Sequence, residues 1–443
     1  MKRNIKSYAM LLGFAGLLFS CNDQLDIDPR NEVKTGEALN TSSDVEAALV
    51  GAYDAAGDED VYGGNIMFLP DLLADNGDIA WVGTYSQPGE VYDKAILENN
   101  SFVAATWMDS YRVINIANSV LANIGKVDQA KRNRVEGEAK FLRGAMYFEL
   151  VKLFGKAWVD GNPSTNPGVP LVLQPTAVIN EASYVRRNTV AEVYAQVLKD
   201  LTEAENLLPS TNGFFATKWA AAGMLSRVYL QQEKFLEAGQ AADRVIKSNR
   251  FRLASTYAEA FNNTTNSTED IFAIQVTSQD GVNGLNTYYS SLQRGDIEIQ
   301  DQLIEQYDPS DERLDIYEGG YTNKFDEQYA VVPILRLAEM YLTRAEASLR
   351  TGTNIGGVTP VADINTIRTR AGLSPRTTVT LAQVLQERKL ELVFEGQLLH
   401  DIKRTRGTID GLPFSSNRLV YPIPQRERDA NVNLTQNPGY FGG

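Results

Sequence analysis

Apolar residues recur at steps of three and four along most of this 443-residue chain. Such spacing places apolar side chains on one face of an α-helix, so it predicts a series of amphipathic helices. One segment, residues 271–276, instead predicts a strand. The predicted helices span residues 42–56, 102–124, 130–154, 190–207, 217–231, 235–247, 333–349 and 381–404. We therefore expect a mostly α-helical fold with minor β structure.

Two predicted helices, residues 217–231 and 235–247, are separated by only a short break, and together they resemble a tetratricopeptide repeat. In that repeat, small residues let two helices approach closely and large aromatic residues fill the remaining gap. The residues with these packing roles here are Trp219, Gly223, Tyr229, Phe235 and Ala238. Looser versions of the pattern occur around Trp107, at residues 139–154 and at residues 337–347. Since three or more units are needed to bury a continuous core, we expect a tetratricopeptide-like helical scaffold.

The periodicity fades in two long segments, residues 65–100 and 251–330. The second is rich in Asn, Thr, Asp, Gly and Tyr. Loops of such length inside a compact domain are usually functional or disordered. We therefore look for functional residues in these two segments.

The first twenty residues are typical of an export signal. Three basic residues precede an apolar run at residues 8–19, far shorter than the roughly 20 residues that span a bilayer as a helix. The only cysteine of the chain, Cys21, follows Ser20 directly and has a leucine three residues before it. This arrangement resembles a bacterial lipobox, in which the thiol is acylated and the preceding peptide is removed. The alternative is an ordinary secreted protein, which would leave an unpaired thiol in an oxidising compartment.

The chain is acidic, with a formal net charge of −14 that becomes −17 once residues 1–20, which carry three basic and no acidic residues, are removed. Nucleic acid is therefore excluded as an expected partner, because it is bound through basic surfaces. The same charge argues against binding of the protein surface to anionic lipid headgroups, which leaves the lipid on Cys21 as the expected tether.

Several kinds of catalytic site lack the residues that they need. The single histidine, His400, lies in a charged helical stretch, and Cys21 is the only thiol, so the sequence predicts neither a zinc site nor a Cys-His pair. No Gly-x-Ser-x-Gly elbow or phosphate-binding glycine loop is present in the sequence. Carboxylates are present, so a catalytic pair for glycoside hydrolysis remains an alternative. Such a pair is defined by the distance between the two carboxyl groups in the folded protein, which the sequence does not show.

Two acidic clusters, residues 58–60 and 308–312, could offer oxygen ligands to calcium. Neither has the glycine and glutamate positions of an EF-hand loop, so we expect solvated loop charge. We predict no cofactor or metal, and structural calcium remains an open alternative.

Five segments carry a family resemblance when they are taken together and in this order. They are residues 136–155 (EGEAKFLRGAMYFELVKLFG), 333–339 (PILRLAE), the helix at 387–407, 421–425 (YPIPQ) and 433–440 (NLTQNPGY). With Cys21 and the following Leu-Asp-Ile-Asp-Pro at residues 25–29, the chain resembles the SusD/RagB family over almost its whole length. The resemblance implies a SusD-like fold in a non-catalytic outer-membrane lipoprotein, exposed at the cell surface, that captures nutrient, usually a glycan. It also implies a SusC-like TonB-dependent transporter as partner.

The resemblance and the N-terminal pattern together give the expected domain organisation. Residues 1–20 are a lipoprotein signal peptide, residues 21–40 a lipidated tether, and residues 41–443 a single SusD-like α-helical domain.

The ligand site of a glycan binder needs exposed aromatic rings on loops, because sugars place flat C–H faces on the rings while polar side chains bond their hydroxyls. Of the four tryptophans, Trp81 lies in the first irregular segment and is our first choice. The full set of candidates is Trp81, Tyr85, Asp78, Tyr92, Tyr288, Tyr289, Tyr317 and Tyr321. For each aromatic residue the competing interpretation is packing against the helical scaffold.

Two other functions remain as alternatives. One is a RagB-like scaffold that binds a peptide or protein partner, and the other is a surface glycoside hydrolase that uses two carboxylates. The sequence does not distinguish an oligosaccharide ligand from a peptide.

Overall fold

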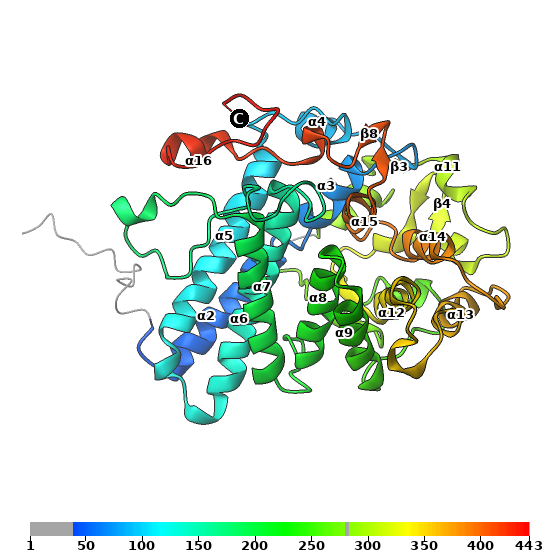
Figure 1. Cartoon of the computed structure of the whole chain (residues 1–443), viewed down its shortest axis with the longest axis horizontal. Coiled ribbons are helices and arrows are strands. Elements are labelled where there is room, and N and C mark those ends of the chain that lie inside the picture. The colour runs from blue at the N-terminus through cyan, green and yellow to red at the C-terminus, as the bar shows by residue number, and fades with distance from the viewer. Residues whose placement is uncertain (1–38, 280–282, 443) are drawn as a thin grey trace, which may run out of the picture. The chain divides into compact units, whose positions relative to one another are not determined.

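A row of helices makes up the larger part of the structure, a computed structural model that describes residues 39–279 and 283–442 (Figure 1). Each helix of this row packs against the next one along the chain. The row consists of α2 (Ser42–Gly57), α5 (Ser101–Ala122), α6 (Gln129–Phe154), α7 (Val190–Leu207), α8 (Lys218–Gln231), α9 (Phe235–Lys247), α12 (Leu337–Thr351) and α13 (Pro360–Arg370). The predicted mostly α-helical fold is confirmed.

Capping residues begin several of these helices where the sequence places Thr three residues before an acidic or amide side chain. The Thr41 hydroxyl accepts from the Asp44 N–H, and the Asp44 side chain accepts from the Thr41 N–H. Thr189 and Glu192 make the same reciprocal pair at the start of α7. These capping boxes satisfy backbone donors that the first helical turn leaves unpaired.

Small residues set the distance between helices, as the repeat pattern predicts. A side chain at Gly239 of α9 would lie 2.8 Å from the Ala347 Cβ of α12 and would also clash with Ile355. The close packing of α9 on α12 therefore requires glycine at this position.

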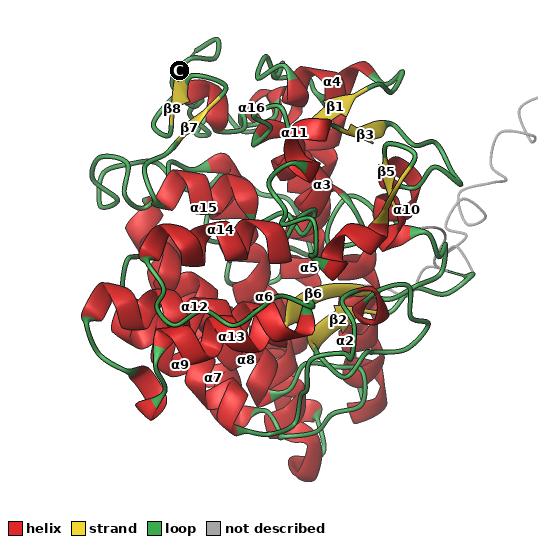
Figure 2. Ribbon diagram, turned by 90° about the vertical axis from the view of Figure 1, so that its right-hand side faces the viewer, coloured by secondary structure: helices red, strands yellow, loops and turns green. Residues whose placement is uncertain are grey.

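Within residues 39–279 and 283–442, four two-stranded antiparallel sheets accompany the helices. They are β1 (Ile79–Trp81) with β3 (Ile297–Ile299), β2 (Asp270–Ile274) with β6 (Val332–Arg336), β4 (Tyr317–Glu318) with β5 (Tyr321–Thr322), and β7 (Thr408–Ile409) with β8 (Leu412–Pro413). The strand expected at residues 271–276 is β2, which ends two residues earlier. Figure 2 shows β1, β3, β5 and α10 (Gly284–Tyr289) close together on one side of the molecule.

Two predicted helices are wrong in part. Residues 333–336, expected to be helical, belong to β6, and the helix starts at Leu337. The helix expected at residues 381–404 is divided into α14 (Leu381–Glu391) and α15 (Leu398–Arg404). Between them Phe394 and Gly396 have positive φ angles of 62° and 67°, which an α-helix does not allow.

The two segments without periodicity contain more regular structure than expected. The additional helices there are α3 (Asn65–Leu73), α4 (Ser86–Tyr92), α10 and α11 (Asp301–Ile304), and outside these two segments α13 and α16 (Gln425–Ala430) were not expected either. Short 3₁₀ turns occupy residues 124–126, 181–183, 258–260, 312–316, 323–325, 355–357 and 417–419. All nine residues of α3 are buried, so the helix has no polar face and shows no amphipathic pattern.

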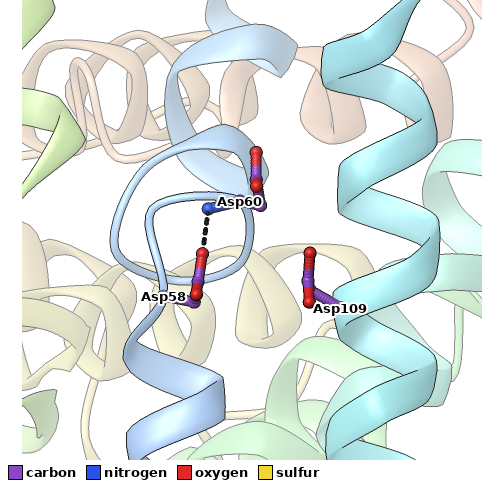
Figure 3. A group of neighbouring side chains, drawn as sticks. All are labelled: Asp58, Asp60 and Asp109. Carbon is purple, nitrogen blue, oxygen red and sulfur yellow. Dashed lines mark hydrogen bonds between the residues drawn. The ribbon is translucent and has the colours of Figure 1, made fainter.

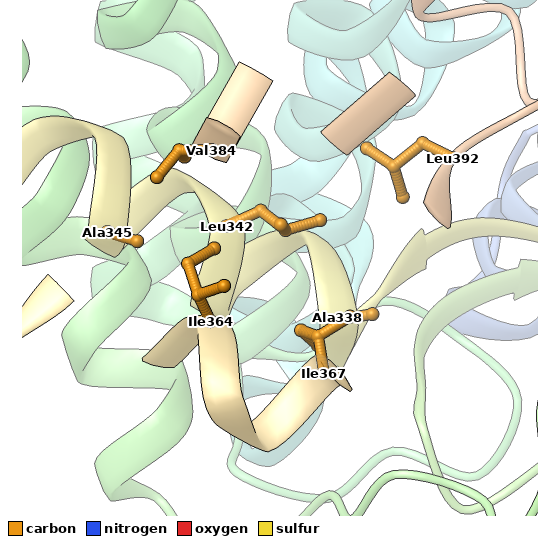
Figure 4. Packing of buried hydrophobic residues seen from close by; sticks show 7 residues of the cluster. All are labelled: Ala338, Leu342, Ala345, Ile364, Ile367, Val384 and Leu392. Carbon is orange, nitrogen blue, oxygen red and sulfur yellow. The ribbon is translucent and has the colours of Figure 1, made fainter. Parts of the chain in front are cut away.

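Part of the hydrophobic core lies between α12, α13 and α14, and Figure 4 shows it from close by. Its members are Ala338, Leu342, Ala345, Ile364, Ile367, Val384 and Leu392, each at most 4% exposed. The apolar faces of these three helices therefore meet in one packed layer.

A second buried group is charged. We call it the buried charge network, and it consists of Arg313, Arg336, Arg370, Glu269, Glu391 and Glu395. Arg336 forms ion pairs with three of these carboxylates, and Glu391 pairs with all three arginines. Arg336 ends β6, Arg370 ends α13 and Glu391 ends α14, so the network joins these three elements to Glu269, which directly precedes β2.

From Thr41 onward the described residues form one compact unit. None of their helices is long and apolar enough to cross a membrane. The predicted signal peptide at residues 1–20, Cys21 and most of the predicted tether lie outside the described residues.

Candidate functional site

The pairing of β1 with β3 brings the two irregular segments together. Trp81 lies opposite Ile297 in this ladder, and its ring centroid is 6.1 Å from that of Tyr288 at the end of α10. Tyr288 stacks on the buried Phe68 of α3 at 4.3 Å, and Tyr85 lies 6.1 Å from Phe102. We call Phe68, Trp81, Tyr85, Phe102 and Tyr288 the aromatic platform. Phe68 and Tyr288 are buried, Phe102 and Trp81 are partly exposed, and Tyr85 is 43% exposed.

Polar side chains border the exposed edge of the aromatic platform. The Arg294 guanidinium lies 4.1 Å from the Tyr85 ring centroid, and it donates to Asp296 Oδ2 at 2.7 Å and to Thr84 Oγ1 at 3.2 Å. A side chain at Gly83 would lie 2.6 Å from the Asp296 carboxyl carbon and would overlap the Trp81 ring. Glycine at this position therefore lets the indole and the carboxylate lie side by side.

The sequence did not single out Arg294 and Asp296. They lie in a Gln-Arg-Gly-Asp stretch inside the irregular segment 251–330, and charged residues next to glycine in such a segment were the available signal. Their closeness to Tyr85 depends on the β1–β3 pairing, which the short strands do not reveal.

Two further candidates flank the aromatic platform. Tyr321 of β5 is half-buried, lies against Gly295, and donates to Glu298 Oε1 at 3.4 Å. Tyr92 is also half-buried, and its hydroxyl donates to the Ile79 carbonyl of β1 at 3.4 Å. Both residues thus lie beside the β1–β3 pair.

Three other candidates bond groups of the protein itself, and two of them, Asp78 and Tyr289, are buried. Asp78 is 5% exposed and pairs with Lys389 at 2.6 Å, while it accepts from Gln306 Nε2 at 2.7 Å. Tyr289 is fully buried and donates to Asp71. The Tyr317 hydroxyl bonds that of Tyr307 at 3.0 Å. We leave these three out of the site that we propose, because their polar groups are already satisfied within the fold.

Asp71 of α3 is buried and has an unusual environment. Its Oδ2 accepts from the Tyr289 hydroxyl at 3.1 Å and from the Gly396 N–H at 3.3 Å. Burial raises the pKa of Asp71 to about 7, although both hydrogen bonds lower it. The folded protein therefore holds a proton that the unfolded chain releases near pH 4.

The variant Asp71→Asn is expected to be more thermostable than the unsubstituted protein at pH 8, by a few degrees. Since the folded pKa of Asp71 is raised, the stability it contributes is present at acidic pH and is lost as the pH rises from about 4 to about 7. Asparagine does not titrate, so the difference between the two melting temperatures should grow over that range. Thermal unfolding followed by circular dichroism at several pH values measures it.

The control for this prediction is Asp308→Asn. Asp308 is exposed, and hydrogen bonds from Ser310 lower its pKa. This variant should show no gain at pH 8. A melting-temperature difference for Asp71→Asn that stays constant from pH 4 to pH 8 would contradict the prediction.

An acidic cluster lies between the end of α2 and α5. Figure 3 shows Asp58 and Asp60, on the loop after α2, facing Asp109 of α5. Carboxylate oxygens of the three lie within 4.8 Å of one another. Burial, followed by repulsion from Asp58, Glu59 and Asp109, raises the pKa of Asp60 to about 7. Three carboxylates can supply part of the six to eight oxygen ligands that Ca²⁺ takes, and backbone carbonyls or water would have to supply the rest.

The single histidine is placed in the interior. His400 is 3% exposed, and burial, with Lys152, Lys403 and Arg227 nearby, lowers its pKa well below the usual value. Its Nε2 atom has no hydrogen-bond partner in the part of the chain that the structure describes.

Two family models match this chain. Residues 23–230 match a family described as "Starch-binding associating with outer membrane", and residues 314–412 match the SusD family. SusD-like protein P2 of Formosa agariphila is 26% identical over 96% of this chain and 97% of that protein. The starch-binding protein SusD of Bacteroides thetaiotaomicron is 35% identical over a shorter stretch, which covers 25% of this chain and 21% of SusD.

Solved structures share the fold over nearly the whole described chain. A SusD superfamily protein from Bacteroides thetaiotaomicron, 26% identical, superposes with a TM-score of 0.82 and covers 90% of this chain and 100% of its own. A SusD-like carbohydrate binding protein from Bacteroides vulgatus, 22% identical, gives a TM-score of 0.78 over 89% of this chain and 97% of its own. The order of sequence motifs, the helical row and both family models agree, and this chain belongs to the SusD/RagB family.

Proposed function

We propose that this protein is a non-catalytic cell-surface lipoprotein that captures an oligosaccharide and delivers it to a SusC-like TonB-dependent transporter in the outer membrane. The observation that carries the proposal is the aromatic platform with its polar border. The relative named starch-binding SusD, and the family described as starch-binding and associated with the outer membrane, support it.

The chemistry of the aromatic platform suits a sugar. The partly exposed Trp81 and Tyr85 offer ring faces on which the C–H side of a pyranose can lie. Arg294 can donate hydrogen bonds and Asp296 can accept them from the hydroxyls at the edge of the same ring. Because Trp81 packs against Tyr288 and Tyr85 against Phe102, the surface is formed before a ligand arrives, which lowers the entropic cost of binding.

The variant Trp81→Ala is expected to weaken oligosaccharide binding about tenfold or more, which corresponds to roughly 1.4 kcal/mol. The expected fall in melting temperature is at most a few degrees, because Trp81 is only partly buried and ends a three-residue strand. Isothermal titration calorimetry with a panel of oligosaccharides, followed by thermal unfolding, measures both quantities.

The matched control is Trp158→Ala. Trp158 is also partly buried but packs on Tyr194, away from the aromatic platform, with ring centroids 5.1 Å apart. Its removal should leave the affinity unchanged. A large fall in melting temperature with retained binding in Trp81→Ala would assign Trp81 to the core instead.

Delivery to a transporter is tested by identifying the proteins that co-purify with this lipoprotein. Purification from mild-detergent extracts of outer membranes should bring down a large β-barrel protein in a constant ratio. Recovery of the lipoprotein without a barrel in each of several mild detergents would argue against the transporter partnership.

The acidic cluster is the observation that favours a second candidate function, that of a surface glycoside hydrolase. Asp60, with its pKa raised to about 7, could act as the acid while a neighbouring carboxylate stays ionised. Steady release of reducing sugar that Asp60→Asn abolishes would establish hydrolysis and overturn the non-catalytic proposal. Binding of unmodified peptides, but of no oligosaccharide, would favour the RagB-like peptide scaffold.

A further inference from the structure

A groove runs along β2, and none of the residues that line it belongs to the aromatic platform. It consists of two hollows of about 490 Å³ and about 330 Å³, and Phe214 and Phe215 line both of them. Residues 273–275 line the larger hollow and residues 270–272 the smaller one, so the two hollows follow each other along the strand. We call this pair of hollows the β2 groove. Each volume lies in the range of about 300–1,000 Å³ that is usual for small-molecule sites.

Phe214, which lines both hollows, is an exposed aromatic residue on a loop that its neighbours hold in place. Phe214 is 53% exposed, although it is a large apolar side chain. The loop that carries it is held by the Ala216 N–H, which donates to the Tyr53 hydroxyl at 3.0 Å, and by Phe215, which packs on the Tyr53 ring at 4.9 Å. The exposure of Phe214 is therefore imposed by an anchored loop.

Polar groups lie beside the aromatic ring in both hollows. Arg112, whose side chain is 57% exposed, and Gln275 line the larger hollow. Arg250 and Asp270 line the smaller one. Asp270 is 4% exposed, and its Oδ1 atom has no hydrogen-bond partner among the described residues. Arg112, Gln275 and Arg250, which line the two hollows, can bond the hydroxyl groups of a ligand.

The β2 groove and the aromatic platform are linked by a chain of contacts. Asp58 lines the larger hollow and belongs to the acidic cluster with Asp60. The Asn65 amide donates to Asp60 Oδ1 at 2.7 Å and to the Phe102 carbonyl at 3.4 Å, and Phe102 is part of the platform. The buried Asn65 thus joins the acidic cluster beside the β2 groove to the aromatic platform.

We propose that the β2 groove is a second saccharide-binding subsite, which holds the distal units of a longer oligosaccharide. The inference rests on the proposed function, since it assumes that the platform takes the first units. Aromatic rings interleaved with Arg, Gln and Asp are the same chemistry as Trp81 and Tyr85 beside Arg294 and Asp296. The groove thus selects for chain length, because a short saccharide reaches only one of the two sites.

The groove favours a saccharide over a peptide strand. A peptide that extends a sheet needs an accessible strand edge with free backbone groups. All five residues of β2 are at most 5% exposed. The strand therefore forms the floor of the groove and offers little backbone to a partner, whereas the side chains around it remain accessible.

The test compares short and long probes on the full-length protein in detergent. The probes are trisaccharides and heptasaccharides of α-glucan, β-glucan, xylan, fructan and pectin, together with an unmodified peptide mixture, each titrated by calorimetry. In Phe214→Ala the affinity for the best heptasaccharide should fall about fivefold to tenfold, and that for the matching trisaccharide should change less than twofold. Phe214→Trp keeps a ring and should retain the affinity for both.

The control variant is Phe441→Ala, which removes a phenylalanine that is 89% exposed and lies outside the groove. It should bind both probes as the unsubstituted protein does. Trp81→Ala, in contrast, should weaken the binding of short and long probes alike.

Three results would overturn the inference, and they differ from one another. If Phe214→Ala binds the heptasaccharide unchanged while Trp81→Ala does not, the subsite is wrong and the proposed function stands. If no saccharide of the panel binds the unsubstituted protein, the proposed function fails and the subsite fails with it. If Phe214→Ala loses affinity for peptides but not for saccharides, the groove binds peptide.

Discussion

The variant Arg336→Met is expected to lose about 3–5 kcal/mol of unfolding free energy, a large share of the 5–15 kcal/mol that is typical of a domain. Arg336 is 1% exposed and pairs with Glu395 at 2.6 Å, with Glu391 at 3.2 Å, and with Glu269. Methionine fills most of the volume but leaves three buried carboxylates without their shared cation. Urea unfolding followed by fluorescence measures the loss.

The matched control is Arg406→Met. Arg406 also forms an ion pair, with Glu233, but its side chain is 48% exposed. Exposed pairs contribute about 0–1 kcal/mol, because water screens them. A loss in Arg336→Met no greater than in this control would show that the buried charge network does not stabilise the fold.

The buried charge network also determines how the stability of the protein depends on pH in the acid range. Desolvation raises the pKa of Glu391, but Arg370, Arg336 and Arg313 outweigh it and hold the value at about 2. A lowered folded pKa means that this carboxylate contributes stability above its unfolded pKa near 4, which is lost as the pH falls through about 2. Arg336→Met should therefore unfold at a higher pH in an acid titration.

The variant Cys21→Ala is expected to leave the membrane almost completely while it folds and binds ligand as before. The thiol of Cys21 is the predicted site of acylation with a diacylglycerol, whose two acyl chains supply the free energy that keeps an acidic protein on a membrane. Without the thiol no chain can be attached. Membrane fractionation with immunoblotting measures retention, and calorimetry with the same oligosaccharide measures binding.

The control for membrane retention is Ser20→Gly, which keeps a small residue directly before the cysteine. This variant should remain in the membrane fraction. Retention of Cys21→Ala at the level of the unsubstituted protein would show that protein contacts, not lipid, hold it there.

The helices that could be predicted from the sequence are those with one apolar face. The boundaries of α7 and α9 agree with the pattern because each has a buried and a solvated side. α3 was missed because all its residues are buried, which erases the periodicity. The break between α14 and α15 was missed because it depends on positive φ angles at Phe394 and Gly396, and the apolar residues around it continue a helical pattern.

The sequence indicated the region of the candidate site but not which of its residues lie together. Trp81, Tyr85 and Tyr288 were selected as aromatic residues outside periodic helices, and the structure places them together. The same rule selected Tyr289, the neighbour of Tyr288, which faces the core. Neighbouring residues on one short helix point in different directions, and no pattern in six residues shows which direction is outward.

The pairing of β1 with β3 joins residues 79–81 to residues 297–299, so the aromatic platform is assembled from segments more than two hundred residues apart. Bringing together segments so distant in sequence costs loop-closure entropy, which other contacts of the fold must offset. A nascent chain that lacks Tyr288 and Arg294 would have only half of the platform. The proposed capture of ligand is therefore a property of the folded chain, because neither segment alone forms the aromatic platform.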